Sequence, residues 1–188
     1  MPGYTTRPLD AESWPDFAEL VEAHNGVWGG CWCMGFHPKG PGWGTSAALN
    51  RAEKEERVRT GEAHAALVYD GDQCVGWCQF GVPEELPRIK NRKAYEQGLG
   101  ELPDWRITCF FVGKGHRGQG VAAAALAGAL EEIERLGGGT VESYPEEVDG
   151  RGSASFLHNG TVAMFEQQGF ARTRPIGKTR WVVRTSVG

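Results

Sequence analysis

The sequence predicts a single mixed α/β domain over residues 1–188, with helices on both faces of one mixed sheet. Strand-like runs rich in β-branched and aromatic residues alternate along the chain with helical runs. The clearest case is CFFVGKGHRGQGVAAAALAGALEEIERL at residues 109–136, where an apolar strand leads through a glycine-rich turn into an alanine-rich amphipathic helix. With 188 residues, 40% of them apolar, the chain is long enough for one domain with its own core.

The chain begins with a predicted strand and a predicted helix. YTTRPL at residues 4–9 indicates the strand. Ser13, followed by a proline and an acidic residue in the first turn, indicates the N-cap of a helix whose apolar residues have helical spacing. Asn25-Gly26 predicts the end of that helix.

Residues 27–44 are rich in glycine and aromatic residues and show no period. Three tryptophans in this segment favour a structured loop over a flexible linker. Cys31, Cys33 and His37 lie in it, but two thiolates and one imidazole leave a tetrahedral zinc site one ligand short. We therefore expect no metal.

Residues 46–60 predict a charged helix that ends at Gly61. Its Glu and Arg residues are spaced four apart, which predicts ion pairs between Glu53 and Arg57 and between Glu55 and Arg59 on a solvent-exposed face.

Two predicted strands, residues 63–69 and 73–81, are joined by Asp70-Gly71-Asp72, which indicates a hairpin. Cys74 and Cys78 are four residues apart on the second strand, so we expect them on one face as buried free thiols. The next segment, 82–104, is polar and interrupted by prolines. It is expected to form a lid-like excursion in which residues 88–97 are a candidate helix.

The C-terminal half completes the sheet. A strand over residues 105–112 is expected to be central, and a helix starts at Val121. TVESY at residues 140–144 predicts a further strand. After a helix near residue 160, GFART and TRWVVRT flank the turn RPIGK and predict a closing antiparallel hairpin.

Composition excludes several classes of protein. The net charge is −4 and the basic residues are dispersed, so the sequence predicts no basic patch of the kind that binds nucleic acid. No run of about 18 apolar residues is present to span a bilayer, and the N-terminus lacks the apolar core of a signal peptide. We expect a cytoplasmic protein with neither a nucleic-acid nor a membrane partner.

The turn after residue 112 has the properties of an anion site. The first N–H groups of a helix lack intrahelical partners and point, with the positive end of the helix dipole, at whatever lies above the turn. Gly118 and Gly120 remove side chains that would keep a phosphate from these groups, and Arg117 adds a positive charge. No Lys-Ser or Lys-Thr follows the glycines as a P-loop requires, and the turn lies too late in the chain for a dinucleotide fingerprint.

R-G-Q-G-V-A at residues 117–122 resembles the pyrophosphate-binding signature R/Q-x-x-G-x-G/A of the GNAT superfamily of N-acetyltransferases. Val112 also matches that family's V-x-x-x-x-R-G-x-G run, and residues 158–170 resemble its N-x-x-A-x-x-x-Y-x-K-x-G-F segment. The resemblance implies the GNAT fold, a mostly antiparallel splayed sheet between helices, and acetyl-CoA as cosubstrate.

By this resemblance, the pantetheine arm of acetyl-CoA would pair with exposed backbone groups of the central strand at Cys109, Phe110, Phe111 and Val112, and its diphosphate would lie in the turn. The implied oxyanion donor is the N–H of Val112. Asn159 is open to two interpretations, a cap of the following helix or a contact of the coenzyme. The implied coenzyme-binding residues are Phe110, Phe111, Val112, Arg117, Gly118, Gln119, Gly120, Val121, Ala122 and Asn159.

The catalytic acid and base are less well defined. Where many family members carry a tyrosine that protonates the leaving thiolate, this chain has Phe165. Glu142 on a strand beside the splay and His158 before a helix are candidates for the base, and Tyr144 could replace the missing phenol. Each also has an ordinary structural interpretation.

The implied activity is transfer of an acetyl group to a primary amine of a small molecule or peptide, and the alternative is a non-catalytic acyl-CoA-binding or regulatory module. In the family, the region of residues 27–44 commonly borders the acceptor pocket, so its aromatics are candidates for substrate walls or for core cover. The long connection over residues 145–158 could shape that site or merely cross the surface. Exposed tryptophans would make a homodimer plausible.

Overall fold

The structure, a computed structural model, describes residues 3–148 and 158–188. Their helices and strands follow the predicted order, with the candidate helix of the excursion added as α3. The elements are β1 Thr5–Pro8, α1 Trp14–Glu22, α2 Ala47–Thr60, β2 His64–Asp70, β3 Gln73–Gly81, α3 Arg92–Gln97, β4 Trp105–Val112, α4 Val121–Arg135, β5 Gly139–Ser143, α5 Val162–Gln167, β6 Ala171–Pro175 and β7 Trp181–Val187, with short 3-10 turns at Trp28–Gly30 and Lys114–His116.

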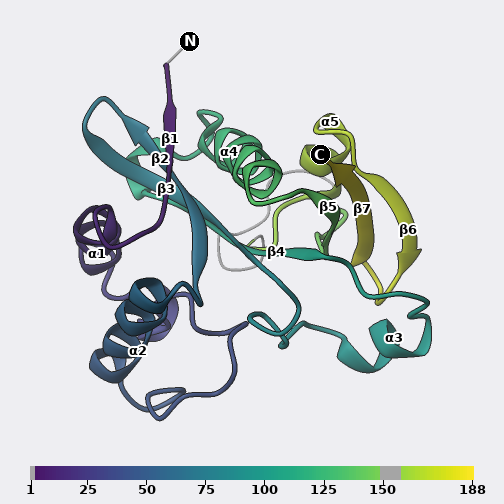
Figure 1. The fold of residues 1–188 in the computed structure, drawn as a ribbon, viewed down its shortest axis with the longest axis horizontal. Helices are drawn as coiled ribbons and strands as arrows, with labels where there is room; N and C mark the ends of the chain where they lie inside the picture. The colour runs from purple at the N-terminus through teal and green to yellow at the C-terminus, as the bar shows by residue number, and fades with distance from the viewer. Residues whose placement is uncertain (1–2, 149–157) are drawn as a thin grey trace.

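The strands form one seven-stranded sheet in the order β1-β2-β3-β4-β5-β7-β6, with β4 in the middle as predicted (Figure 1). Among the named strands, β4 and β5 form a parallel pair, and each of the other neighbouring pairs is antiparallel. The predicted mixed, mostly antiparallel sheet is confirmed.

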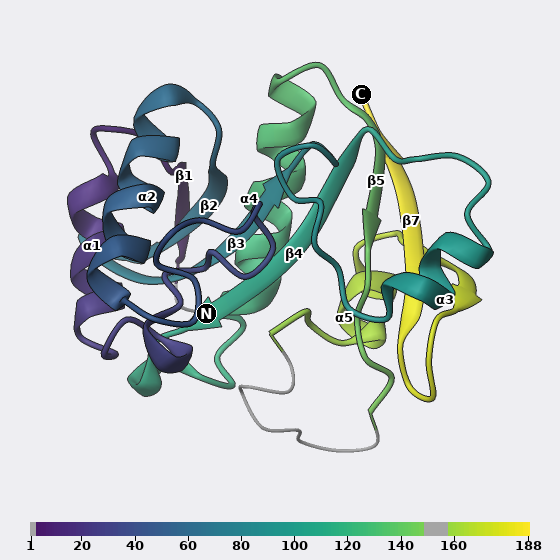
Figure 2. The ribbon, with the colours of Figure 1, turned by 90° about the horizontal axis from the view of Figure 1, so that it is seen from below.

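Helices cover both faces of this sheet. Helix α4 lies over one face, where the buried side chains of Ala125, Leu126 and Ile133 pack against the strands in one core cluster. Helices α1 and α2 and the loop between them lie on the opposite face with a second cluster, and α3 lies on that same side over a third (Figures 1 and 2). Side-chain alternation along each strand produces the two faces.

Strands β4 and β5 separate after a short contact. Their pairing covers only Trp105 to Ile107 on β4, opposite Val141 to Ser143 on β5. Beyond these residues the two ribbons diverge toward the C-terminal end of β4 (Figure 2). The splay predicted from the family resemblance is therefore present, and β4 keeps an edge that β5 does not cover.

Ser13 is the N-cap residue of α1, as predicted, but its side chain makes no capping hydrogen bond. The Asp10 carboxylate accepts the backbone N–H groups of Glu12 and Ser13, while the Ser13 hydroxyl donates to the Pro8 carbonyl. Asp10 therefore holds the turn that leads into α1.

The prediction that Cys74 and Cys78 lie on one face of the sheet is wrong. The pairing of β2 with β3 shifts register between Val68 and Tyr69, which is a bulge. The extra residue moves Cys74 to the α1 face and Cys78 to the α4 face. Both thiols are buried and free, as predicted.

Helix α2 is not uniformly solvent-exposed. Arg57 pairs with Glu53 as predicted, but Glu55 pairs with Arg51 and Arg59 pairs with Glu56 instead of with each other. Lys54, only 1% exposed, points into the protein. The i,i+4 pattern alone did not reveal which charged residue faces the core.

Candidate active site

The turn between β4 and α4 forms an open cradle of backbone. Gly118 and Gly120 have φ angles of +73° and +86°, in the left-handed region that favours glycine, and no heavy atom lies within 4 Å of the position of a Cβ on either. The Arg117 Nε donates to the Val112 carbonyl at 3.3 Å, and the Gln119 amide donates to the Gly115 carbonyl at 3.0 Å, which fixes the loop around the opening. Val121 and Ala122 follow as the first residues of α4, where helix N–H groups lack intrahelical partners. The arrangement fits a phosphate group, with no side chain to block it.

The uncovered edge of β4 is partly occupied by the chain itself. The Phe110 N–H donates to the His158 carbonyl at 2.7 Å, so the expectation that this backbone group is exposed is wrong. Residues 158–160 therefore lie beside β4 where β5 has diverged. Because backbone N–H groups alternate in direction along a strand, the Val112 N–H points to the same side as the Phe110 N–H and lies two residues nearer the turn. The Phe111 ring packs on the α1 face of the sheet.

Asn159 holds this segment against the sheet. Its side chain is buried, its Nδ2 donates to the Thr108 carbonyl, and its Oδ1 accepts from Arg180 at 2.8 Å. The N-cap of α5 is Thr161, whose hydroxyl accepts the Met164 N–H, so the predicted cap at Asn159 is wrong. Both ends of the Asn159 amide bind protein groups.

A cavity of about 430 Å³ lies on the α1/α2 side of β4. Its walls come mainly from the 27–44 loop, so the predicted structured loop does form a pocket wall. That loop also contributes to the core, since Trp32, Cys33 and Met34 are buried in it. The lining residues are Trp28, Cys31, Cys33, Gly35, Phe36, Trp43, Arg88, Ile89, Lys90, Cys109 and His158.

A buried polar cluster lies behind the cavity. The Lys54 Nζ contacts the Gln79 Oε1 at 2.6 Å and the His37 Nε2 at 3.1 Å. Burial lowers the pKa of Lys54 and of His37. Burial acts to raise the pKa of Cys33, but a hydrogen bond with Cys109 and the nearby Lys54 lower it below its usual value. The same hydrogen bond, together with burial, raises the pKa of Cys109.

The metal ligands considered from the sequence are used otherwise. His37 contacts Lys54, Cys33 pairs with Cys109, and Cys31 lies in the cavity wall. Over residues 3–148 and 158–188, no group of three or more His, Cys, Asp or Glu side chains is arranged to hold a metal ion.

Of the three catalytic candidates, the structure brings His158 to the cavity. Its ring lies 5.6 Å from the Trp28 ring and 5.9 Å from the Phe36 ring, and its backbone is tied to β4 through Phe110. An imidazole can exchange a proton near neutral pH. His158 is thus a titratable group in the wall of an aromatic cavity, beside the central strand.

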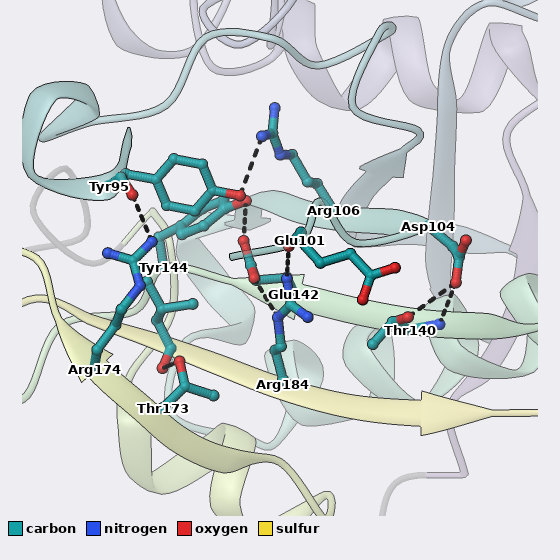
Figure 3. A network of polar contacts seen from close by, with 11 residues as sticks. Tyr95, Glu101, Asp104, Arg106, Thr140, Glu142, Tyr144, Thr173, Arg174 and Arg184 are labelled. Carbon is teal, nitrogen blue, oxygen red and sulfur yellow. Dashed lines mark hydrogen bonds and ion pairs between the residues drawn. The ribbon is translucent and has the colours of Figure 1, made fainter. Parts of the chain in front are cut away.

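Glu142 and Tyr144 belong to a separate network under α3 (Figure 3). The Tyr144 hydroxyl donates to the Glu142 Oε1 at 2.9 Å, and Arg184 donates to the Oε2. Both Glu142 and Tyr144 are 1% exposed, and neither lines the cavity. Burial raises the pKa of Tyr144 well above its usual value. The paired carboxylate is built as a structural ion pair.

Phe165 occupies the position of the family's tyrosine and is fully buried. Its ring makes edge-to-face contacts with Phe110 at 5.8 Å and Phe170 at 4.9 Å. These contacts explain an apolar residue there, since a hydroxyl in this cluster would meet rings rather than acceptors.

Two residues of the site were missed by sequence reasoning. Lys54 sits in a helix whose other charges are exposed, and Arg88 sits in the proline-interrupted excursion. The Arg88 N–H pairs with the Phe36 carbonyl at 3.1 Å. Nothing in the sequence pairs residues 52 positions apart, so that contact could not be found.

In the part of the chain that the structure describes, no helix is both long and apolar enough to cross a membrane.

Comparisons with known proteins agree with this architecture. A GNAT-family protein from Desulfovibrio desulfuricans aligns with a TM-score of 0.55 and 14% identity over 99% of this chain and 100% of that chain. The protein yncA from Salmonella typhimurium, solved with its cofactor acetyl-CoA, aligns with a TM-score of 0.53 and 13% identity over 98% of this chain and 94% of that chain. A structure described as histone acetyltransferase HPA2 and related acetyltransferase, from Corynebacterium glutamicum, aligns with a TM-score of 0.53 and 18% identity over 96% of this chain and 94% of that chain. These likenesses show the fold.

A search of curated proteins finds no match. The sequence matches the model of the Acetyltransferase (GNAT) family over residues 28–170, a span that includes β4, the glycine turn and α5. That match covers most of the chain, and the splayed sheet and the open turn are in the places that the motifs predicted: the chain belongs to the GNAT acetyltransferase family.

Proposed function

We propose that this protein, acting as one domain, transfers an acetyl group from acetyl-CoA to a primary amine of a small molecule or peptide held in the aromatic cavity. The observation that carries the proposal is the turn at Gly118 and Gly120, where the positions that side chains would take are open at the N-terminus of α4, and the first N–H groups of a helix lack intrahelical partners. Acetyl-CoA supplies the thioester. The family membership, and the acetyl-CoA bound to yncA, support the choice of donor.

Three parts of the site would each have one role in this reaction. The turn from Arg117 to Ala122 binds the diphosphate, and the N–H of Val112 stabilises the negative charge that develops on the carbonyl oxygen. The amine nitrogen forms a bond to the acetyl carbon while the carbon–sulfur bond breaks. The proton that the nitrogen loses passes to His158 and then to the departing thiolate, so no covalent enzyme intermediate is needed.

Acetyl-CoA binding and turnover test this function in two steps. Calorimetry measures the Kd for acetyl-CoA, and release of free thiol with a panel of amines measures transfer. Gly120→Val places a β-branched side chain at a φ of +86° in the mouth of the cradle, so we expect the Kd to rise about 10- to 100-fold, the effect of losing one or two hydrogen bonds to a charged group.

Gly169→Val is the matched control. Gly169 has a φ of +88° and equally open surroundings, but it lies between α5 and β6. Gly169→Val imposes the same backbone strain as Gly120→Val but away from the turn, so the affinity for acetyl-CoA should be unchanged. Undiminished affinity in Gly120→Val would contradict the proposed cradle.

A non-catalytic acyl-CoA-binding module is the second candidate, and the buried Phe165 ring favours it, because no phenol is present to protonate the thiolate. Tight acetyl-CoA binding with no thiol release across a broad amine panel would support this candidate instead.

A further inference from the structure

The cavity contains a cationic group with unused hydrogen-bonding capacity. The Arg88 Nη1 is buried, and it has no hydrogen-bond partner among the described residues. A buried, unpaired donor on a charged group is costly and rare, so a ligand that supplies an acceptor to this guanidinium would be stabilised. Arg88 also lines the cavity directly.

Arg88 is held in place at its backbone and at its side chain. The Arg88 backbone N–H donates to the Phe36 carbonyl at 3.1 Å, which joins the 82–104 excursion to the 27–44 loop. The guanidinium carbon lies 4.6 Å from the centre of the Trp43 ring, a cation–π contact. The side chain is therefore oriented before any ligand binds, as a specificity group should be.

The charge around the cavity is unbalanced. Lys90 stands with Arg88 in the lining, and none of the described lining residues is Asp or Glu. Of the neighbouring carboxylates, Glu85 pairs with His64 at 2.8 Å, and Glu53 pairs with Arg57 through its Oε1 at 3.2 Å while its Oε2 is buried without a partner among the described residues. Neither side chain lines the cavity. The remaining wall is aromatic, with Trp28, Phe36 and Trp43.

Resting on the proposed function, we infer that the acceptor is an amino acid with an apolar body, whose carboxylate pairs with Arg88 while its amine reaches the side of the cavity beside β4. A guanidinium matches a carboxylate in shape and charge, and the aromatic walls match the apolar body. A volume of about 430 Å³ is within the usual range for small ligands. His158 and Cys109 mark the side nearest the central strand, where the acetyl group would arrive.

The test compares acceptors that differ only in the acid. Phenylalanine, phenylalanine amide and phenethylamine are offered with acetyl-CoA, alongside the same set built on leucine. The inference expects the KM for the free acid to be about 10- to 100-fold lower than for its amide or amine, which is the usual gain from a hydrogen bond to a charged group. In Arg88→Met this preference should vanish, while the Kd for acetyl-CoA stays unchanged.

Arg92→Met is the matched control. It removes the same charge from an exposed arginine of the same excursion, which pairs with Glu96 outside the cavity, and it should keep the preference for the acid. Binding supplies a readout without turnover: N-acetylphenylalanine should quench the cavity tryptophans at about 10-fold lower concentration than N-acetylphenethylamine in the wild type, and at equal concentration in Arg88→Met.

The outcomes separate this inference from the proposed function. Transfer to amines with no preference for the acid overturns the carboxylate subsite alone. A weakened Kd for acetyl-CoA in Arg88→Met would assign the guanidinium to the coenzyme and also overturn the inference. Absence of acetyl-CoA binding in the wild type would overturn the proposed function itself.

Discussion

Two polar clusters lie on the same face of the sheet, and they differ in whether their polar atoms are paired. Under α3, Glu142 has one oxygen bonded to Tyr144 and the other to Arg184 (Figure 3). At the cavity, the Arg88 Nη1 is buried without a partner among the described residues. A carboxylate with both oxygens paired holds two strands together, whereas the Arg88 guanidinium lines a cavity and keeps hydrogen-bonding capacity that the described residues do not use.

The comparison also shows why position on a strand is weak evidence for catalysis. Glu142 pairs with Arg106 of β4, within the short stretch over which β4 and β5 are still paired before they diverge. Its side chain points under α3, where Tyr95, Arg106 and Tyr144 enclose it in the network. A buried carboxylate in such a network is used for structure unless a substrate can reach it.

The largest expected effect is on stability, at Glu142. Glu142→Ala leaves the Arg184 guanidinium, 26% exposed, and the buried Tyr144 hydroxyl without their shared partner. We expect the free energy of unfolding to fall by about 3 kcal/mol, the low end for breaking a buried pair, as measured by urea denaturation. Acetyl-CoA affinity of the folded fraction should be kept.

An exposed ion pair provides the control. Glu147→Ala removes a carboxylate that pairs with Arg172 at 2.6 Å on the surface, and this should cost at most about 1 kcal/mol. If Glu142→Ala were as stable as Glu147→Ala but inactive, Glu142 would act in catalysis and not in holding the strands together.

The next effect is on turnover, at His158. His158→Gln keeps the size of the side chain and the backbone carbonyl that accepts the Phe110 N–H, but removes the titrating imidazole. We expect kcat to fall about 100-fold, a typical loss for a general base, with the Kd for acetyl-CoA unchanged. The pH profile of kcat should lose the acidic limb that the imidazole contributes.

Equal kcat values for His158→Gln and the wild type would show that the cavity wall supplies no base. In that case, a water molecule or the Glu142 network would have to accept the proton.

The overall fold could be predicted from the sequence because local signals decided it. The glycine turn at 117–120 and the amphipathic stripe of α4 each depend on residues close in the chain, and the order of strands followed from the family resemblance. Side-chain partners could not be predicted in this way. Lys54 meets Gln79 and His37 from distant segments, and the bulge that separates Cys74 from Cys78 depends on pairing with β2.

The candidate site shows the same division between local and distant signals. Backbone sites such as the turn at Gly118 and Gly120 are encoded by consecutive residues, since a left-handed φ needs glycine locally. Arg88 and His158 come from loops that meet only in the folded protein, 70 positions apart in the chain.

The smallest expected effect sharpens the same comparison at Phe165. Phe165→Tyr restores the family's phenol, but the ring is fully buried against Phe110 and Phe170, so the new hydroxyl would lack an acceptor. We expect a loss of about 1–3 kcal/mol in unfolding free energy and no gain in kcat, while Phe165→Leu, which adds no polar atom, separates the packing loss from the cost of the hydroxyl. A rise in kcat would show that the new hydroxyl reaches the thiolate, and that the phenylalanine at this position limits turnover.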